Sequence, residues 1–249
     1  HNQGRFADSM PILLFALELL GEVFPATDEA AWGLFGPEFE KTEGLLAPHS
    51  AEALLNMPEM TDPNPLLRMR LHLALSHTVY MMGAFGAFFV NACRMVQTTL
   101  LHGESDLACI GYLPYMTAMA AAGKPYTLCY ATGKRALTLA EKRDNKYFRL
   151  TTYQFFAPFY LHWCEPLEHS FSYLDKGVEM GLQGINPLSA GYCALLRSVN
   201  HLAKGTRLEA LESECLQGLK YLENSRQLNT RAMLLYGVCL LYTSDAADE

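Results

Sequence analysis

A regular spacing of tight corners constrains the fold of this chain more than any other feature. The corners centre on four positions that lie 41 residues apart: Ala84, Pro125, Pro166 and Arg207. Apolar residues recur at helical spacing on both sides of the corners, as at Phe171, Leu174 and Val178. A period near 40 residues with two helices per unit is typical of a solenoid of helical repeats. We therefore expect an all-α fold, an α-solenoid of stacked antiparallel helical hairpins.

The pattern predicts four complete hairpins and the start of a fifth. The expected helices cover residues 66–82 and 88–101, 107–122 and 127–142, 147–163 and 168–182, 189–203 and 208–223, with a further helix over 230–238. The unit is longer than the tetratricopeptide motif of about 34 residues, and it lacks the Trp-x-x-Leu-Gly-x-x-Tyr pattern of that motif. We therefore expect tetratricopeptide-like hairpins with a period of about 41 residues.

A helix is also expected near the N-terminus, over residues 10–20. Ser9 is placed to cap this helix, and Pro11 stands where a first turn tolerates proline. Gly21 marks the end of the helix. The stretch contains Glu18 and is shorter than the roughly 20 apolar residues that a membrane span needs, so it is not expected to cross a membrane.

A less regular helix is expected over residues 28–46, interrupted at Gly36-Pro37. Ser50 begins a short capped turn. Residues 57–65 contain three prolines that disfavour regular structure, so this stretch reads as a connector before the hairpins.

The last residues, Cys239 to Glu249, resemble a translated transposon-type sequencing adapter, and we expect the chain to be an internal piece of a longer sequence. The expected organisation is residues 1–62 as N-terminal helices and Pro-rich connector, 63–238 as the helical-repeat array, and 239–249 as the adapter-derived tail.

Charge and cysteine content narrow the class of protein. The net charge of −7, with no basic run longer than two residues, argues against nucleic acid and anionic membrane as partners. Seven cysteines lie 15 or more residues apart within apolar patterns: Cys93, Cys109, Cys129, Cys164, Cys193, Cys215 and Cys239. We expect them to be reduced core thiols of a cytoplasmic protein.

No stretch of the sequence encodes recognisable catalytic chemistry. Gly123-Lys124 and Gly133-Lys134 lack the preceding glycine and the following Ser or Thr of a phosphate-binding loop. The histidines are scattered and form no zinc-binding spacing: His72, His77, His102, His162, His169 and His201. No residue is therefore assigned a catalytic, cofactor-binding or metal-binding role, and no cofactor is expected in this chain.

Eight aromatic residues precede and enter the third corner: Tyr147, Phe148, Tyr153, Phe155, Phe156, Phe159, Tyr160 and Trp163. They could line a ligand groove, but on a helix between two neighbours they more often fill the core. We interpret Trp163 as a packing anchor where helix meets helix, and Pro166 as the start of the next helix.

Several short stretches resemble one protein family: residues 50–55, 57–63, 94–96, 133–137 and 162–167. The family comprises large bacterial signalling proteins. In these a serine/threonine-kinase-like domain precedes an AAA/STAND-type ATPase, a helical-repeat region, and often a GAF sensor and a histidine kinase of the two-component type. The match covers residues 40–230, within the helical-repeat region. Where the family often has a basic residue between Trp and Glu-Pro-Leu, this chain has only Cys164.

The resemblance implies a non-catalytic scaffold or regulatory module of a multidomain signal-transduction kinase, making protein–protein or interdomain contacts. The parent would bind ATP in its other domains and act as an ATP-dependent protein kinase. Two alternatives stay open. One is a free-standing peptide-binding repeat protein, and the other is a small helical ligand-binding domain or enzyme.

Overall fold

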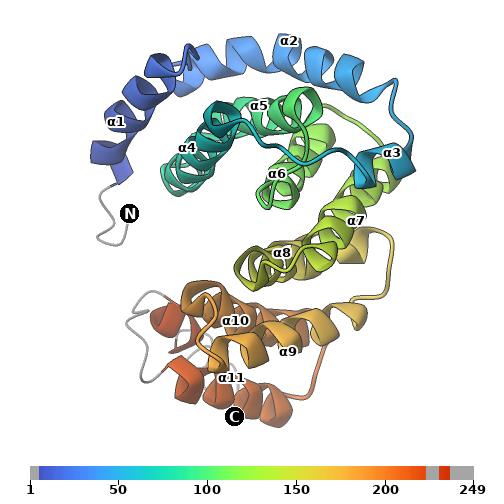
Figure 1. Ribbon diagram of the computed structural model, residues 1–249. Coiled ribbons are helices and arrows are strands. Elements are labelled where there is room, and N and C mark those ends of the chain that lie inside the picture. Colours follow the sequence, from blue (N-terminus) through green and yellow to red (C-terminus); the bar gives the residue numbers. More distant parts are fainter. Residues whose placement is uncertain (1–5, 223–229, 236–249) are drawn as a thin grey trace. The chain divides into compact units, whose positions relative to one another are not determined.

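The computed structural model describes residues 6–222 and 230–235, and these residues divide between two compact units, 1–143 and 144–249 (Figure 1). In the described ranges, eleven α-helices, one 3₁₀ helix and helical residues 230–235 make up the regular structure, apart from one isolated β-bridge. From α4 (Pro63–Met81) onward, helices that follow one another within a unit pack antiparallel. The predicted all-α class is confirmed.

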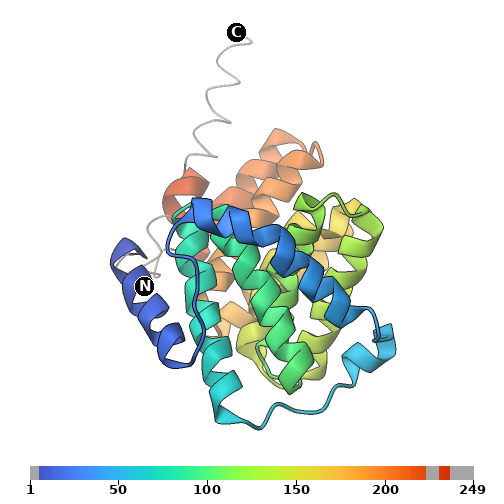
Figure 2. The same ribbon diagram turned by 90° about the horizontal axis from the view of Figure 1, so that it is seen from above.

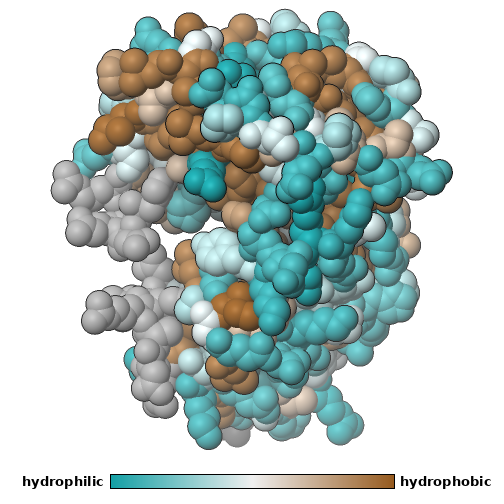
Figure 3. Space-filling model, in the orientation of Figure 1, coloured by the Kyte–Doolittle hydropathy of each residue, from teal (hydrophilic) through white to brown (hydrophobic). Residues whose placement is uncertain are grey.

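The first unit contains α1 (Phe6–Leu19), α2 (Asp28–Leu46), α3 (Ala51–Leu55), α4 (Pro63–Met81), α5 (Phe85–His102), α6 (Ala108–Ala121) and α7 (Tyr126–Lys142). Each of α4 to α6 packs on the helix that follows it, whereas α1 packs on α4 and α2 packs on α5. Figures 1 and 2 show α1 and α2 laid over α4 and α5. We call residues 6–46 the N-terminal arm. Figure 3 shows apolar side chains gathered where Figure 1 places α1.

Several helices of the described chain end in the same way, at a glycine with positive φ. In the first unit these are Gly21 (φ 77°), Gly83 (φ 70°) and Gly123 (φ 76°), and in the second Gly184 (φ 82°) and Gly205 (φ 76°). At each, the next residue donates its N–H to a carbonyl five positions back, as Ala84 does to Val79 at 2.9 Å. This is the Schellman motif, which favours glycine because a left-handed residue with a Cβ is strained. The expected corners near Ala84, Pro125 and Arg207 are therefore real helix ends.

Two expectations for the arm are wrong. The first helix begins at Phe6, so Ser9 and Pro11 lie inside it rather than at its start. The predicted break at Gly36-Pro37 is absent, because α2 runs unbroken from Asp28 to Leu46 with Pro37 inside it. Extensive packing on α5 overrides the weak local propensity.

The connector is shorter and better anchored than expected. α4 already begins at Pro63, where the Asp62 side chain accepts the N–H of Asn64 at 2.9 Å. Upstream of α4, Met60 donates its N–H to the Glu104 carbonyl at 2.8 Å, and the Glu104 N–H returns to Pro58 at 2.7 Å. The expected capped turn at Ser50 is confirmed, since its hydroxyl accepts the N–H of Ala53.

The second unit contains α8 (Lys146–Phe159), the 3₁₀ helix η1 (Leu161–Trp163), α9 (His169–Leu182), α10 (Pro187–Ala203) and α11 (Leu208–Leu222). α10 lies at its centre and packs on α8, α9 and α11. A core cluster of Leu150, Leu174 and Cys193, each fully buried, joins α8, α9 and α10.

The aromatic corner differs from its prediction at both ends. The helix expected to reach Trp163 ends at Phe159 and gives way to η1, and α9 begins at His169 instead of Pro166. Trp163 is half-buried and meets the Tyr160 ring edge-on at 5.2 Å. Leu161, fully buried, anchors the corner more deeply than Trp163 does.

Some of the residues predicted to lie in the core are buried, and others are exposed. Five cysteines are free and buried as expected: Cys93, Cys109, Cys129, Cys193 and Cys215. Cys164 is exposed because it follows the last turn of η1, and Cys239 lies outside the described residues. Among the eight aromatic residues, Tyr153 and Phe156 are buried, while Tyr147 and Phe159 are exposed. The aromatic stretch therefore serves both core and surface.

Candidate functional site

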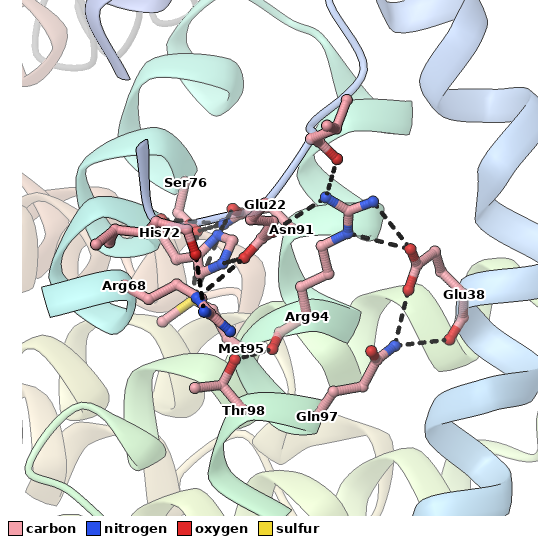
Figure 4. Close-up of polar contacts among 12 residues, drawn as sticks. Glu22, Glu38, Arg68, His72, Ser76, Asn91, Arg94, Met95, Gln97 and Thr98 are labelled. Atoms are coloured by element: carbon pink, nitrogen blue, oxygen red, sulfur yellow. Dashed lines mark hydrogen bonds and ion pairs between the residues drawn. The ribbon is translucent and has the colours of Figure 1, made fainter. Parts of the chain in front are cut away.

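A cluster of polar side chains lies where the N-terminal arm meets α4 and α5 (Figure 4). Its members come from the arm (Glu22, Glu38, Thr42), from α4 (Arg68, His72, Ser76) and from α5 (Asn91, Arg94, Gln97). The three α5 residues recur every third position, so one face of a largely apolar helix carries all of them. We call these nine residues the arm clamp.

The Glu22 carboxylate is the electrostatic centre of the arm clamp. Arg94 Nη1 lies 3.0 Å from Glu22 Oε1, and His72 Nε2 lies 3.1 Å from Oε2. Arg68 Nε approaches Oε2 at 3.5 Å as an ion-pair contact, while its Nη2 donates to the Leu20 carbonyl at 3.2 Å. Two guanidinium groups and the His72 ring therefore converge on one carboxylate whose side chain is 14% exposed.

These partners set the protonation state of Glu22. Burial alone would raise its pKa, but the hydrogen bond and charge of His72, together with Arg94, lower the pKa from 4.5 to about 2. Glu22 is consequently ionised near neutral pH and holds no proton to donate. A carboxyl group with so low a pKa is a poor general acid or base.

His72 forms hydrogen bonds at both ring nitrogens. Its Nδ1 lies 2.7 Å from Asn91 Oδ1. The Asn91 amide is oriented by its Nδ2, which donates to the His72 carbonyl at 3.0 Å and to Ser76 Oγ at 2.6 Å. Both ring nitrogens of the fully buried His72 therefore face oxygen atoms, Oδ1 of Asn91 and the carboxylate of Glu22.

Arg94 joins the loop of the arm to α2. Its Nη1 also donates to the Val23 carbonyl at 2.8 Å, and its Nε and Nη2 donate to Glu38 Oε1 at 3.1 and 3.0 Å. The guanidinium lies over the Phe24 ring at 5.1 Å. Gln97 then donates to the other Glu38 oxygen at 2.9 Å. The planar guanidinium suits this fork of acceptors, which an ammonium would not match.

Further acidic residues attach α2 along its length. At its start, Asp28 Oδ1 accepts the N–H of Ala87 at 2.9 Å, which caps α5 and explains why that helix begins three residues earlier than predicted. Near its end, Glu43 accepts the Tyr115 hydroxyl at 2.6 Å and pairs with Lys124 at 2.7 Å. Burial, and then the hydrogen bond and charge of Glu43, raise the pKa of Tyr115.

The arrangement of the clamp is that of a structural fastening. Hydrogen bonds and ion pairs already engage Glu22, His72 and Arg94, so they present no open position for a reacting group. Among residues 6–222 and 230–235, no group of three or more His, Cys, Asp or Glu side chains is placed to hold a metal ion. Nor is any helix in these ranges long and apolar enough to cross a membrane.

Of the histidines singled out in the sequence, the structure brings only His72 into the clamp. His201 instead stacks on Phe171 at 4.3 Å and contacts Thr206 Oγ1 at 3.1 Å. Gly123 is a helix cap, and Gly133-Lys134 lies within α7. The sequence reasoning missed the clamp, although the polar residues at three-residue intervals in apolar α5 were a signal for it.

No family model matches the chain, and comparisons with curated proteins and with solved structures found no match.

Proposed function

We propose that this chain is a non-catalytic helical-repeat module, a scaffold that makes protein–protein or interdomain contacts. One observation carries the proposal: among the glycine caps, the three that end the first helix of a proposed hairpin recur at a near-constant interval, whereas those at Gly21 and Gly184 lie outside these corners. Gly83 and Gly123 lie 40 residues apart, and Gly123 and Gly205 lie 82 residues apart, twice the proposed period of 41. Recurrence of one cap at one interval supports a tetratricopeptide-like array.

On this proposal the repeated hairpins are α4–α5, α6–α7, α8–α9 and α10–α11, with η1 standing in for the glycine corner in the third. The arm would then close the first hairpin with an arm clamp instead of a further repeat. Modules of this kind work by presenting side chains on fixed helices to other proteins. The sites that carry their function are surfaces and not clefts with reacting groups.

The resemblance of the short stretches to bacterial multidomain signalling kinases suggests the parent. There the module would lie between an AAA/STAND-type ATPase and downstream sensor or histidine-kinase domains, coupling one to the other. ATP would bind to the ATPase and kinase domains. None of their motif residues has a counterpart in this chain.

Sequencing the gene on both sides of this segment tests the parent directly. We expect a phosphate-binding loop upstream and a GAF or histidine-kinase motif downstream in the same reading frame. A gene with neither would contradict the proposed parent and favour a free-standing peptide-binding repeat protein.

Binding to the neighbouring domain tests the scaffold role. The purified chain should bind the separately expressed ATPase domain directly in isothermal titration calorimetry, without ATP hydrolysis by the chain itself. Hydrolysis or phosphotransfer by the chain alone would contradict a non-catalytic module.

A further inference from the structure

The outward face of α1 is an exposed apolar strip. Ile12, Phe15 and Leu19 recur at positions i, i+3 and i+7 and are 69%, 60% and 71% exposed. The opposite side of the helix is also apolar, and there Leu17 is fully buried in the core cluster shared with α4. A helix that is apolar on both sides normally has a partner on each. In Figure 3 apolar side chains gather where Figure 1 places α1.

On the arm itself the charged side chains have one sign, although Arg68 and His77 of α4 adjoin its two ends. Residues 6–40 contain seven acidic residues and no Lys, Arg or His. Three of the seven, Glu22, Asp28 and Glu38, point into contacts with α4 and α5. Glu18 is exposed on α1 beside Leu19, and Glu29 and Glu40 are exposed on α2. A partner that approaches the outward face of the arm therefore meets apolar side chains with acidic ones beside them.

Charge also distinguishes three partners that could cover the strip: a second copy of the chain, an anionic lipid surface and a basic helix. In a two-fold dimer the same patch lies on both subunits, so the acidic residues of two copies would face each other. An anionic lipid surface would be repelled for the same reason. A helix with an apolar stripe flanked by Lys or Arg is complementary to both the apolar side chains and the acidic charge of the strip.

We propose that the strip formed by Ile12, Phe15 and Leu19, with Glu18 beside it, docks a basic amphipathic helix of a partner protein. The i, i+3, i+7 spacing gives a ridge of two helical turns, which matches the groove that one amphipathic helix offers to another. The inference rests on the proposed scaffold function and specifies the chemistry of one partner.

A fluorescently labelled 18-residue Leu/Lys amphipathic helix serves as the probe, and its Leu/Glu counterpart with the same apolar stripe serves as the comparison. We expect saturable binding of the Lys peptide in fluorescence anisotropy, and binding at least tenfold weaker for the Glu peptide. Phe15→Ser with Leu19→Ser should weaken binding of the Lys peptide at least tenfold, because the two substitutions remove most of the apolar surface that the peptide would cover. Both side chains are exposed, so the fold should survive, as circular dichroism would check.

The matched control is Leu182→Ser with Leu202→Ser, which removes two leucines that are 73% and 60% exposed in the second unit. This control should leave the affinity unchanged, and Glu18→Lys should lower it. Equal binding of both peptides, or equal losses in the two double variants, would overturn the proposal.

Two further outcomes would assign the strip to another occupant. A dimer in sedimentation analysis that Leu19→Ser dissociates would assign it to a second copy, and binding to phosphatidylserine vesicles would assign it to lipid. If the ATPase domain binds the wild type while the Lys peptide does not, the docking inference fails and the scaffold function stands. If neither binds, both fail.

Discussion

The two units of the molecule hold their helices together by different means. In the first, long charged side chains fasten α2 onto α5, through Glu38, Arg94 and the Glu22 loop. In the second, α9 approaches its neighbours closely through glycine: a Cβ on Gly177 would lie 2.5 Å from Cys193 Sγ, and one on Gly181 would collide with Ala190 Cβ. Close approach at glycine also occurs in the first unit, where a Cβ on Gly86 of α5 would lie 2.7 Å from the Trp32 ring of α2. What distinguishes the first unit is the cluster of buried charge pairs that accompanies this approach.

Glycine has opposite roles in the two helices α2 and α9. The glycines of α2 (Gly33, Gly36 and Gly44) have no atom within 4 Å of an added Cβ, so no close approach requires them. Helical glycine costs about 1 kcal/mol relative to alanine. α2 thus carries a propensity cost that its polar contacts to α5 offset, whereas α9 gains close packing from the same residue.

Removing Arg94 should produce the largest effect and should be confined to the first unit. Arg94→Ala leaves Glu22 and Glu38 buried without their shared cation, and we expect a loss of about 3–5 kcal/mol. Hydrogen exchange on the full chain would show α2 and α5 losing protection while α10 keeps it. Arg94→Lys keeps the charge but not the fork of donors. Its loss of stability should lie between zero and that of Arg94→Ala. An Arg94→Ala loss below 1 kcal/mol would contradict a charge-fastened arm.

Acid should weaken the first unit selectively. Because the folded pKa of Glu22 is about 2 and its ordinary value is 4.5, its contribution is complete above pH 4.5 and disappears as pH falls towards 2. The shift corresponds to about 3 kcal/mol. Urea unfolding followed through the first unit should lose this amount between those pH values, and Glu22→Gln should flatten the dependence.

The second unit offers the comparison for this acid effect. Glu168 also has a lowered pKa, through a hydrogen bond from its own backbone and the nearby Lys204, but its side chain is exposed. Glu168→Gln should therefore leave acid unfolding almost unchanged. An equal effect of the two Glu→Gln substitutions would break the distinction between the units.

Filling a glycine contact should destabilise the second unit. Gly181→Ala forces a methyl group against Ala190 Cβ, which sits on α10 and can yield only if the two helices separate. We expect a loss of about 1–3 kcal/mol, measured as loss of exchange protection in α9 and α10. No change on this substitution would show that the close approach of α9 and α10 is not needed for stability.

Features that depend on neighbouring residues, such as helix ends and helix extents, can be predicted from the sequence. The positive-φ glycines and the apolar periodicity predict most helices of both units to within a few residues. The arm clamp could not be read in this way, because Glu22 and His72 are 50 residues apart and Glu22 and Arg94 are 72 apart. The continuity of α2 through Pro37 has the same origin, since packing on α5 and not local propensity maintains the helix.

The smallest expected effect is a stabilisation, and it tests the meaning of the open glycines. Gly33→Ala adds a methyl group that meets no atom within 4 Å, at a residue of ordinary helical conformation. It should therefore raise the stability of the first unit by up to about 1 kcal/mol, through helix propensity and the lower entropy of the unfolded chain. Gly33→Ala and Gly181→Ala should be compared in the same hydrogen-exchange experiment. The first should raise the stability of its unit and the second should lower it, although each adds one methyl group. If Gly33→Ala instead destabilised the chain, the outer face of α2 would have to be covered, and α2, like α1, would have a second partner.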